Sequence, residues 1–263
     1  MNSEDLQKQC SIIVSSCDAF SDVWEAFFTL FFRYWPDCPF PIYLVSESKT
    51  YTDSRITPIL VGADLKWASN TKKALNQIST PHILYMQEDY LLQSPVQTEK
   101  IVALLKLMQQ GHAACIRLYP SPGPNKKYAQ SELVGEIDKN SNYSISLQAT
   151  LWDKQFLLGQ LIDGESGWDM EFKGSERAAK LSATFLCVYI SAIDYFATAI
   201  KRGRWYYDAV QLCEREGIKL DLSKRPVETQ HEYYFRLVKQ TPYIGRVASF
   251  LERRTRNYIK LFI

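Results

Sequence analysis

Apolar and polar residues alternate in blocks along the first part of the chain. Short apolar runs of strand length occur at 11–16 and 41–48, and a denser run occurs at 81–92. Between the first two runs, the segment WEAFFTLFFRYW has the apolar spacing of a helix that ends at Pro36. Because a strand, a helix and a second strand in this order form a βαβ unit, the pattern predicts a parallel sheet with a right-handed crossover.

The same alternation continues beyond this first unit. We expect helices at 64–78, 98–110 and 152–161, strands at 113–119 and 143–151, and a surface loop in the proline-rich segment 120–130. The predicted fold class is therefore α/β, with a Rossmann-like nucleotide-binding sheet, a mixed C-terminal part and a C-terminal helical extension. We place the domain boundary between a catalytic-type domain at 1–225 and the extension at 226–263.

Composition and charge narrow the classes of protein that fit the chain. Its 263 residues, 46% of them hydrophobic, are enough for one large domain with its own core. A net charge of +2 gives no indication of nucleic-acid binding, and none is expected. The six cysteines lack metal-type spacing and are expected to be reduced. The N-terminus lacks the pattern of a secretory signal and no apolar run is long enough to span a bilayer, so we expect a cytoplasmic protein.

Two adjacent carboxylates, Glu88 and Asp89, follow the densest apolar run. Ligands of open α/β sheets gather at the carboxyl ends of the strands, so carboxylates there are well placed to hold a divalent cation against a phosphate. An acidic pair after a strand is also typical of a solvated turn. Both interpretations are compatible with the sequence.

Polar residues also end the first two predicted strands. Ser15, Ser16 and Asp18 are candidates for hydrogen bonds to the ribose or base of a nucleotide, and Glu47 for the ribose hydroxyls. Lys73 is a candidate for the diphosphate, although lysines on helices are commonly only solvated charges. The chain contains neither GxGxxG nor GxxxxGK[ST], which argues against a dinucleotide enzyme and a P-loop kinase.

Five segments follow one another in the order SIIVSSCDAF, PIYLVSES, WASNTKKAL, LYMQEDYLL and GWDMEF. In this order they resemble bacterial GT-A-fold glycosyltransferases of surface-polysaccharide assembly, which build capsule, O-antigen or lipopolysaccharide. The resemblance spans about residues 10–225. It implies a hexosyltransferase that moves a sugar from a nucleotide donor, in the first place a UDP-sugar, to a surface glycan or a lipid-linked acceptor, with inversion.

The resemblance also implies a divalent metal on the donor diphosphate, held by an acidic DxD-like motif. The matching positions are Gln87, Glu88 and Asp89, so an amide replaces the first acid and Asp89 is the best metal ligand. Oxygen ligands favour Mn or Mg. Because GT-A enzymes often recruit a C-terminal histidine, His231 is a second candidate ligand.

An inverting transferase needs a base for the acceptor hydroxyl, and the resemblance points to the acids near Trp168. Glu171 is the first choice, Asp169 the second and Glu165 the third, with the Trp168 ring packing on the sugar. The structural alternative is that these acids stabilise the N-terminus of the helix that follows.

From Pro242 onward the sequence has a basic amphipathic pattern. At 100° per residue, one face carries Ile244, Val247, Leu251, Tyr258 and Phe262, and the other carries Arg246, Arg253, Arg256 and Lys260. This pattern favours a helix that lies on an anionic membrane, and hence a peripheral enzyme at the inner face of the plasma membrane. The alternative is a terminal helix docked on the domain.

For the whole chain, the alternative to an enzyme is a non-catalytic module that binds a nucleotide-sugar or a glycan.

Overall fold

The computed structural model describes residues 3–111 and 113–240. The chain forms two compact units, Met1–Ala197 and Thr198–Ile263. The boundary that the sequence places after residue 225 stays a prediction. Within the second unit, the Trp205 amide donates to the Pro226 carbonyl at 2.9 Å and the Glu228 amide donates to the Trp205 carbonyl at 2.8 Å.

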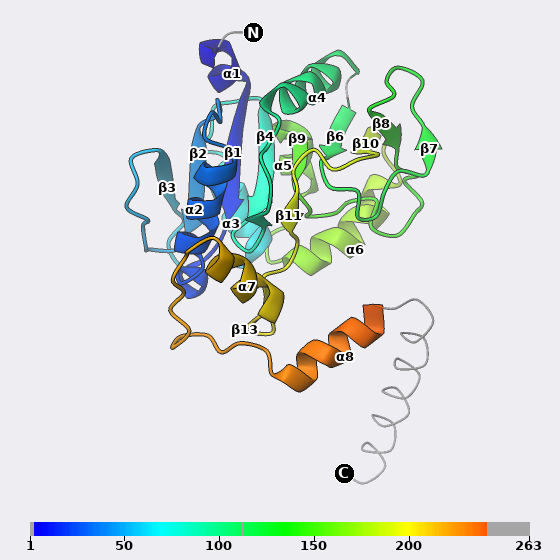
Figure 1. Ribbon diagram of the computed structural model, residues 1–263. Coiled ribbons are helices and arrows are strands. Elements are labelled where there is room, and N and C mark those ends of the chain that lie inside the picture. The colour runs from blue at the N-terminus through cyan, green and yellow to red at the C-terminus, as the bar shows by residue number, and fades with distance from the viewer. Residues whose placement is uncertain (1–2, 112, 241–263) are drawn as a thin grey trace. The chain divides into compact units, whose positions relative to one another are not determined.

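A nine-stranded sheet in the order β3-β2-β1-β4-β9-β6-β10-β8-β7 forms the first unit (Figure 1). Its strands are β1 (Cys10–Ser15), β2 (Ile42–Ser46), β3 (Ile56–Leu60), β4 (His82–Gln87), β6 (Ala113–Arg117), β7 (Lys126–Lys127), β8 (Val134–Glu136), β9 (Thr150–Asp153) and β10 (Thr184–Val188). Neighbours β3, β2, β1 and β4 are parallel, and β9 lies antiparallel between β4 and β6. The predicted α/β class, with a largely parallel sheet and a mixed C-terminal part, is confirmed.

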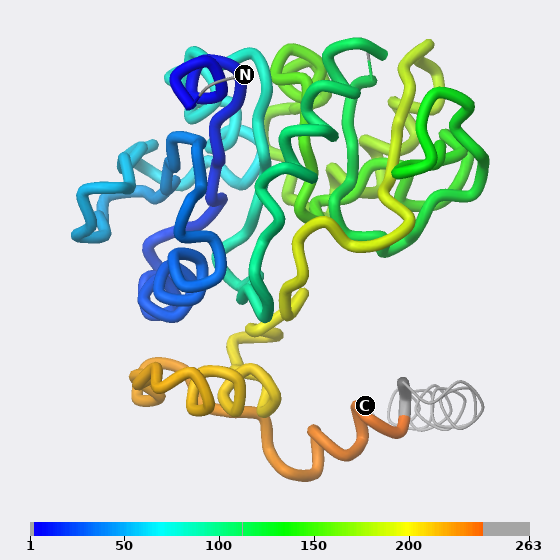
Figure 2. Tube along the Cα trace, turned by 45° about the horizontal axis from the view of Figure 1, so that its top comes forward, coloured from blue at the N-terminus to red at the C-terminus, as the bar shows by residue number. Residues whose placement is uncertain are grey.

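Helices and a small second sheet complete this unit, and the chain can be followed through it in Figure 2. They are α1 (Ser3–Gln9), η1 (Asp18–Phe20), α2 (Trp24–Tyr34), α3 (Trp67–Leu75), β5 (Leu91–Leu92), α4 (Thr98–Gly111), α5 (Lys154–Gln160), α6 (Gly167–Ala178) and β11 (Tyr195–Phe196). β5 and β11 pair antiparallel.

The core follows from the two-residue period of the strands. Ile13, Ile83 and Trp152 point to one face of the sheet, where buried side chains of α3, α5 and α6 cover them. Ile12 and Val14 alternate with Ile13 and point to the other face, where they are also buried. A sheet buried on both faces needs continuous apolar runs, which is why the sequence pattern located these strands.

Local chemistry displaced two predicted boundaries. The segment predicted as a strand at 143–151 is irregular until Thr150, and the next helix starts at Lys154 because the Asp153 carboxylate caps it by accepting from the Phe156 amide at 2.7 Å. The strand β3 was not predicted. It contains Pro58, which a sheet tolerates in an edge strand, and its exposed positions interrupt the apolar run.

The second unit contains β12 (Ile200–Lys201), β13 (Arg204–Trp205), α7 (Tyr207–Arg215) and α8 (Gln230–Gln240). Arg202 and Gly203 both have positive φ, as a tight hairpin turn requires. Arg236 holds α8 to the rest of this unit, because its Nη2 bonds Asp208 at 2.8 Å and Glu228 at 2.6 Å.

One buried cation organises the carboxyl end of β6. The side chain of Arg117 is 1% exposed. It donates to the carbonyls of Pro122 at 2.6 Å, Tyr143 at 2.8 Å and Ser144 at 3.2 Å. The guanidinium therefore supplies hydrogen-bond donors to carbonyls of two irregular segments, one after β6 and one before β9.

We predict that Arg117→Met lowers the free energy of unfolding of the first unit by about 3 kcal/mol or more. The apolar side chain leaves three carbonyls without this donor, and each buried unsatisfied polar group costs about 1–3 kcal/mol. Arg55→Met is the matched control, because Arg55 pairs with Asp53 at the surface and such pairs contribute about 0–1 kcal/mol. Urea unfolding of both variants checks this, and equal losses would contradict it.

Candidate functional site

The candidate site lies where β1 and β4 end side by side. Ser15 is the register partner of both Val45 on β2 and Gln87 on β4. The chain leaves β1 towards β2 on one side and returns to β4 on the other, so the gap between β1 and β4 is a topological switch point. Ligands of open α/β sheets bind at such points, outside the carboxyl ends of the strands. The predicted residues after these three strands are therefore neighbours.

Asp18 and Glu47 hold the loops after β1 and β2 together. Asp18 Oδ1 accepts from the amides of Ser48 at 3.1 Å and Lys49 at 3.0 Å, and Oδ2 accepts from the Ser48 hydroxyl at 2.5 Å. The Glu47 carboxylate accepts in return from the Asp18 amide. Partial desolvation opposes ionisation of Asp18, but these hydrogen bonds outweigh it and lower its pKa to about 2. Both carboxylates thus have structural partners in addition to any ligand.

The other predicted nucleotide-binding residues also have partners. Ser16 Oγ accepts from Trp24 Nε1 at 2.7 Å, and Ser15 is the half-buried last residue of β1. Lys73 Nζ donates to the Val61 carbonyl at 2.9 Å. These contacts fix the side chains near the strand ends, and a role in binding a nucleotide stays a prediction.

The acidic pair after β4 is withdrawn from solvent. Glu88 is 8% and Asp89 is 9% exposed, which an ordinary solvated turn does not require. Burial, and next the charge of Glu88, raise the pKa of Cys17 to about 11, which places Glu88 close to the loop after β1. Burial raises the pKa of Tyr195, and the charge of Asp89 adds to this effect. The two carboxylates therefore act on different neighbours.

Within residues 3–111 and 113–240, no group of three or more His, Cys, Asp or Glu side chains is arranged to hold a metal ion. Mg and similar hard cations at phosphate sites commonly take only one or two carboxylates, with phosphate and water completing the shell. The buried oxygens of Glu88 and Asp89 fit that donor set. His231 lies in the second unit on α8, exposed, with its ring stacked on Phe235 at 6.3 Å. Its role as a ligand stays a prediction.

Glu171 and Tyr90, the residue that follows the acidic pair, both form hydrogen bonds with the backbone of Leu147. Glu171 Oε1 accepts from the Leu147 amide at 2.8 Å and from Ser146 Oγ at 3.1 Å. The Leu147 carbonyl accepts from the hydroxyl of Tyr90, which directly follows Asp89, at 2.9 Å. Leu147 thus links Glu171 to Tyr90, and both hydrogen bonds of Glu171 fall on the same carboxylate oxygen.

Asp169 has a different environment, at the N-terminus of α6. It forms a capping box with Ser166, and its Oδ1 pairs with Lys173 Nζ at 2.8 Å. The bond to Lys173 and then those to Ser166 lower the pKa of Asp169. Glu165 pairs with Arg177 at 2.8 Å. Asp169 thus caps the helix, as the structural alternative has it, whereas Glu165 pairs with a residue in the last turn of the same helix.

Trp168 lies on the solvent side of α6, with 68% of its surface exposed.

The sequence analysis did not identify Tyr90 and Tyr195, whose ring centroids lie 4.7 Å apart in a stacked arrangement beside the acidic pair. Tyr195 OH donates to Gln148 Oε1 at 2.7 Å and accepts from the Ala149 amide at 3.0 Å. The position of Tyr90 directly after Asp89 could have identified it as a candidate site residue. The sequence around Tyr195 contains no comparable signal.

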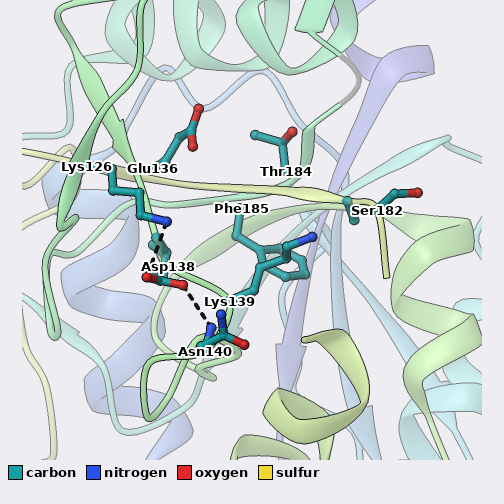
Figure 3. Close-up of a pocket in the computed structure, with 10 residues that line it drawn as sticks. Lys126, Glu136, Asp138, Lys139, Asn140, Ser182, Thr184 and Phe185 are labelled. Carbon is teal, nitrogen blue, oxygen red and sulfur yellow. Dashed lines mark hydrogen bonds and ion pairs between the residues drawn. The ribbon is translucent and has the colours of Figure 1, made fainter. Parts of the chain in front are cut away.

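A separate cavity of about 410 Å³ lies at β7, β8 and the amino end of β10 (Figure 3). Lys126 points towards Asp138 there and pairs with it at 3.2 Å. The switch point lies instead at the carboxyl ends of the parallel strands. This cavity is therefore distinct from the candidate site.

A comparison with protein-family models finds no match, and neither does one with curated proteins. Solved structures do match. Staphylococcus aureus TarS residues 1–349 in complex with UDP-GlcNAc has a TM-score of 0.51 and 17% identity, over 82% of this chain and 68% of that chain. Its complex with UDP has a TM-score of 0.50 and 14% identity, over 90% and 74%. The chain has a GT-A-like nucleotide-binding fold. At these identities the likeness extends to the fold alone.

The basic amphipathic segment from Pro242 onward lies outside the described residues, so its membrane role stays a prediction. No helix in the described part of the chain is long and apolar enough to cross a membrane.

We predict that the stabilisation provided by Asp18 is lost in acid. Its pKa of about 2 in the folded protein lies below the ordinary value of about 4, so ionised Asp18 stabilises the fold above about pH 4 and this contribution falls as the pH drops towards 2. In urea unfolding, the free-energy gap between wild type and Asp18→Asn should widen from pH 2 to 4 and then stay constant. A gap that is the same at every pH would contradict this.

Proposed function

We propose that the protein is a glycosyltransferase that moves a hexose from a UDP-sugar to a hydroxyl of a surface glycan or lipid-linked acceptor, with inversion. The observation that carries the proposal is a buried acidic pair at the switch point of a GT-A-like sheet, with Glu171 linked through Leu147 to Tyr90, the residue that follows the pair. The TarS structures of the same fold contain UDP-GlcNAc and UDP, which supports a nucleotide-sugar donor.

The donor binds along the ends of β1, β2 and β4 in this proposal. Ser15, Ser16, Asp18 and Glu47 surround the nucleoside, Lys73 approaches the diphosphate, and Trp168 packs on the sugar. Asp89, with Glu88 beside it, would hold Mn or Mg. Such a cation would supply positive charge against the negative charge that develops on the leaving diphosphate.

Glu171 is the base in this proposal. It takes the proton of the acceptor hydroxyl while the hydroxyl oxygen attacks C1 of the sugar from the side opposite the diphosphate, which inverts the configuration. Oε1 is fixed by the Leu147 amide, and within the described part of the chain no hydrogen-bond donor occupies Oε2. A base needs such an open oxygen. Asp169 has donors on both oxygens, so we assign it to the helix cap.

We predict that UDP-sugar with Mn stabilises the wild-type protein against heat and that Asp89→Asn abolishes the Mn-dependent part. A ligand at about 100 times its Kd stabilises by about 2.7 kcal/mol, which is readily measured. Asp163→Asn is the control, since Asp163 is an exposed carboxylate paired with Lys72. Titration calorimetry of Mn in the presence of UDP gives a second readout. Mn affinity unchanged in Asp89→Asn would remove Asp89 from the metal site.

We predict that Glu171→Gln keeps the affinity for the donor and lowers kcat by about 10² to 10⁴, because only the proton transfer is lost. Asp169→Asn should retain kcat and lower the thermal stability, because it removes the pairing with Lys173. Donor binding, turnover and melting temperature are measured on both variants. Normal turnover of Glu171→Gln with an inactive Asp169→Asn would move the base to Asp169.

A second candidate function is a non-catalytic module that binds a nucleotide-sugar or glycan. Gln87 favours it, because an amide stands where the family pattern has its first acid. Hydrolysis of the donor in the presence of Mn distinguishes the two, since a binding module would stabilise the donor complex without turning it over.

A further inference from the structure

The outer face of α6 carries two exposed aromatic rings beside the proposed base. Trp168 and Phe172 are four residues apart and so lie on the same side of the helix, with exposed fractions of 68% and 52%. Glu171 precedes Phe172, about 100° away around the helix. Large aromatic side chains are usually buried for their apolar area, so exposed rings at a polar site need a reason.

Phe172 packs against a second ring, that of Tyr143, with their centroids 5.1 Å apart and their planes at 52°. Tyr143 comes from the irregular segment before β9, and its φ is +59°. Bulky residues seldom adopt this left-handed conformation, and such residues cluster at ligand sites. The backbone of Tyr143 is therefore held in an unfavourable conformation while its ring lies against Phe172.

The buried side chain of Arg117 stabilises this backbone conformation of Tyr143. Its Nη2 donates to the carbonyl of Tyr143 at 2.8 Å. Three residues further along the same segment, Ser146 and then Leu147 donate to Glu171. One short segment thus fixes both the Tyr143 ring and the carboxylate of the proposed base.

We propose that Tyr143 and Phe172 form the acceptor subsite and stack on the apolar C–H face of a pyranose, whose hydroxyl is thereby presented to Glu171. This proposal rests on the proposed function and names the acceptor chemistry of the same site. A pyranose has an apolar face with a hydroxyl rim, which matches rings flanked on α6 by the polar side chains of Asp169 and Lys173.

The area of the Tyr143 and Phe172 rings favours a pyranose over a protein partner as the ligand. Each aromatic side chain offers about 150–250 Å². Two rings therefore fall well short of the roughly 800 Å² per partner that a stable protein interface buries.

The test uses two variants that the fold tolerates. Tyr143→Gly removes the ring and suits positive φ, and Phe172→Ala removes an exposed ring with a good helix former. Tyr189→Ala is the control, since Tyr189 is also an exposed aromatic residue of the first unit, at 46%. The readouts are UDP-GlcNAc hydrolysis without acceptor, transfer to methyl β-pyranosides of glucose, galactose and N-acetylglucosamine, and saturation-transfer NMR of the same pyranosides.

In both variants we expect pyranoside KM, and NMR-detected affinity, to worsen by about 2- to 10-fold per ring, which is the contribution of an aromatic contact. Donor hydrolysis without acceptor, measured on each variant, reports separately any displacement of Glu171. The control should match wild type. Wild-type protein that hydrolyses donor but binds no pyranoside, or variants that bind pyranosides normally, would overturn the subsite. Failure of the wild type to bind or hydrolyse UDP-sugars would instead overturn the proposed function.

Discussion

Parallel pairing of β1 with β4 is the constraint on which the rest of the first unit depends. Six register pairs run from Cys10 with His82 to Ser15 with Gln87, and they bring together strands more than seventy residues apart in sequence. Because β2 lies on the other side of β1, the loops after all three strands end at one edge. Through this pairing the acidic pair lies close to the loop after β1, where the charge of Glu88 contributes to the raised pKa of Cys17.

The irregular segment before β9 links the two halves of the candidate site. Arg117 satisfies its carbonyls from the sheet side, and Glu171 accepts from it on the helix side. Tyr90 closes the connection by donating to Leu147. Buried backbone groups outside regular structure need hydrogen-bond partners. The contacts that satisfy the backbone of this segment are therefore the same contacts that fix the Glu171 carboxylate.

Hydrophobic periodicity was sufficient for the elements that lie fully inside the unit. β1, β4 and α2 occur where the apolar runs and the helical spacing predicted them, because burial on both faces leaves a local pattern. Residues 143–149 also alternate like a strand, yet among residues 3–111 and 113–240 they pair with no strand. Ile145 and Leu147 are buried in the core that α6 covers, but Ser144 and Ser146 between them are buried too, so the alternation of residue types does not reflect two faces of a strand.

The sequence by itself determined the α/β class, the order of the main elements and the presence of carboxylates at strand ends, because these depend on residues close in the chain. Only the tertiary structure decided what each carboxylate does. Asp169 and Glu171 are two residues apart on one helix, but Asp169 meets Ser166 and Lys173 of its own helix, whereas Glu171 meets a peptide from a distant segment. A carboxylate's role follows from the donors around it, and donors brought from elsewhere in the chain have no trace in the local sequence.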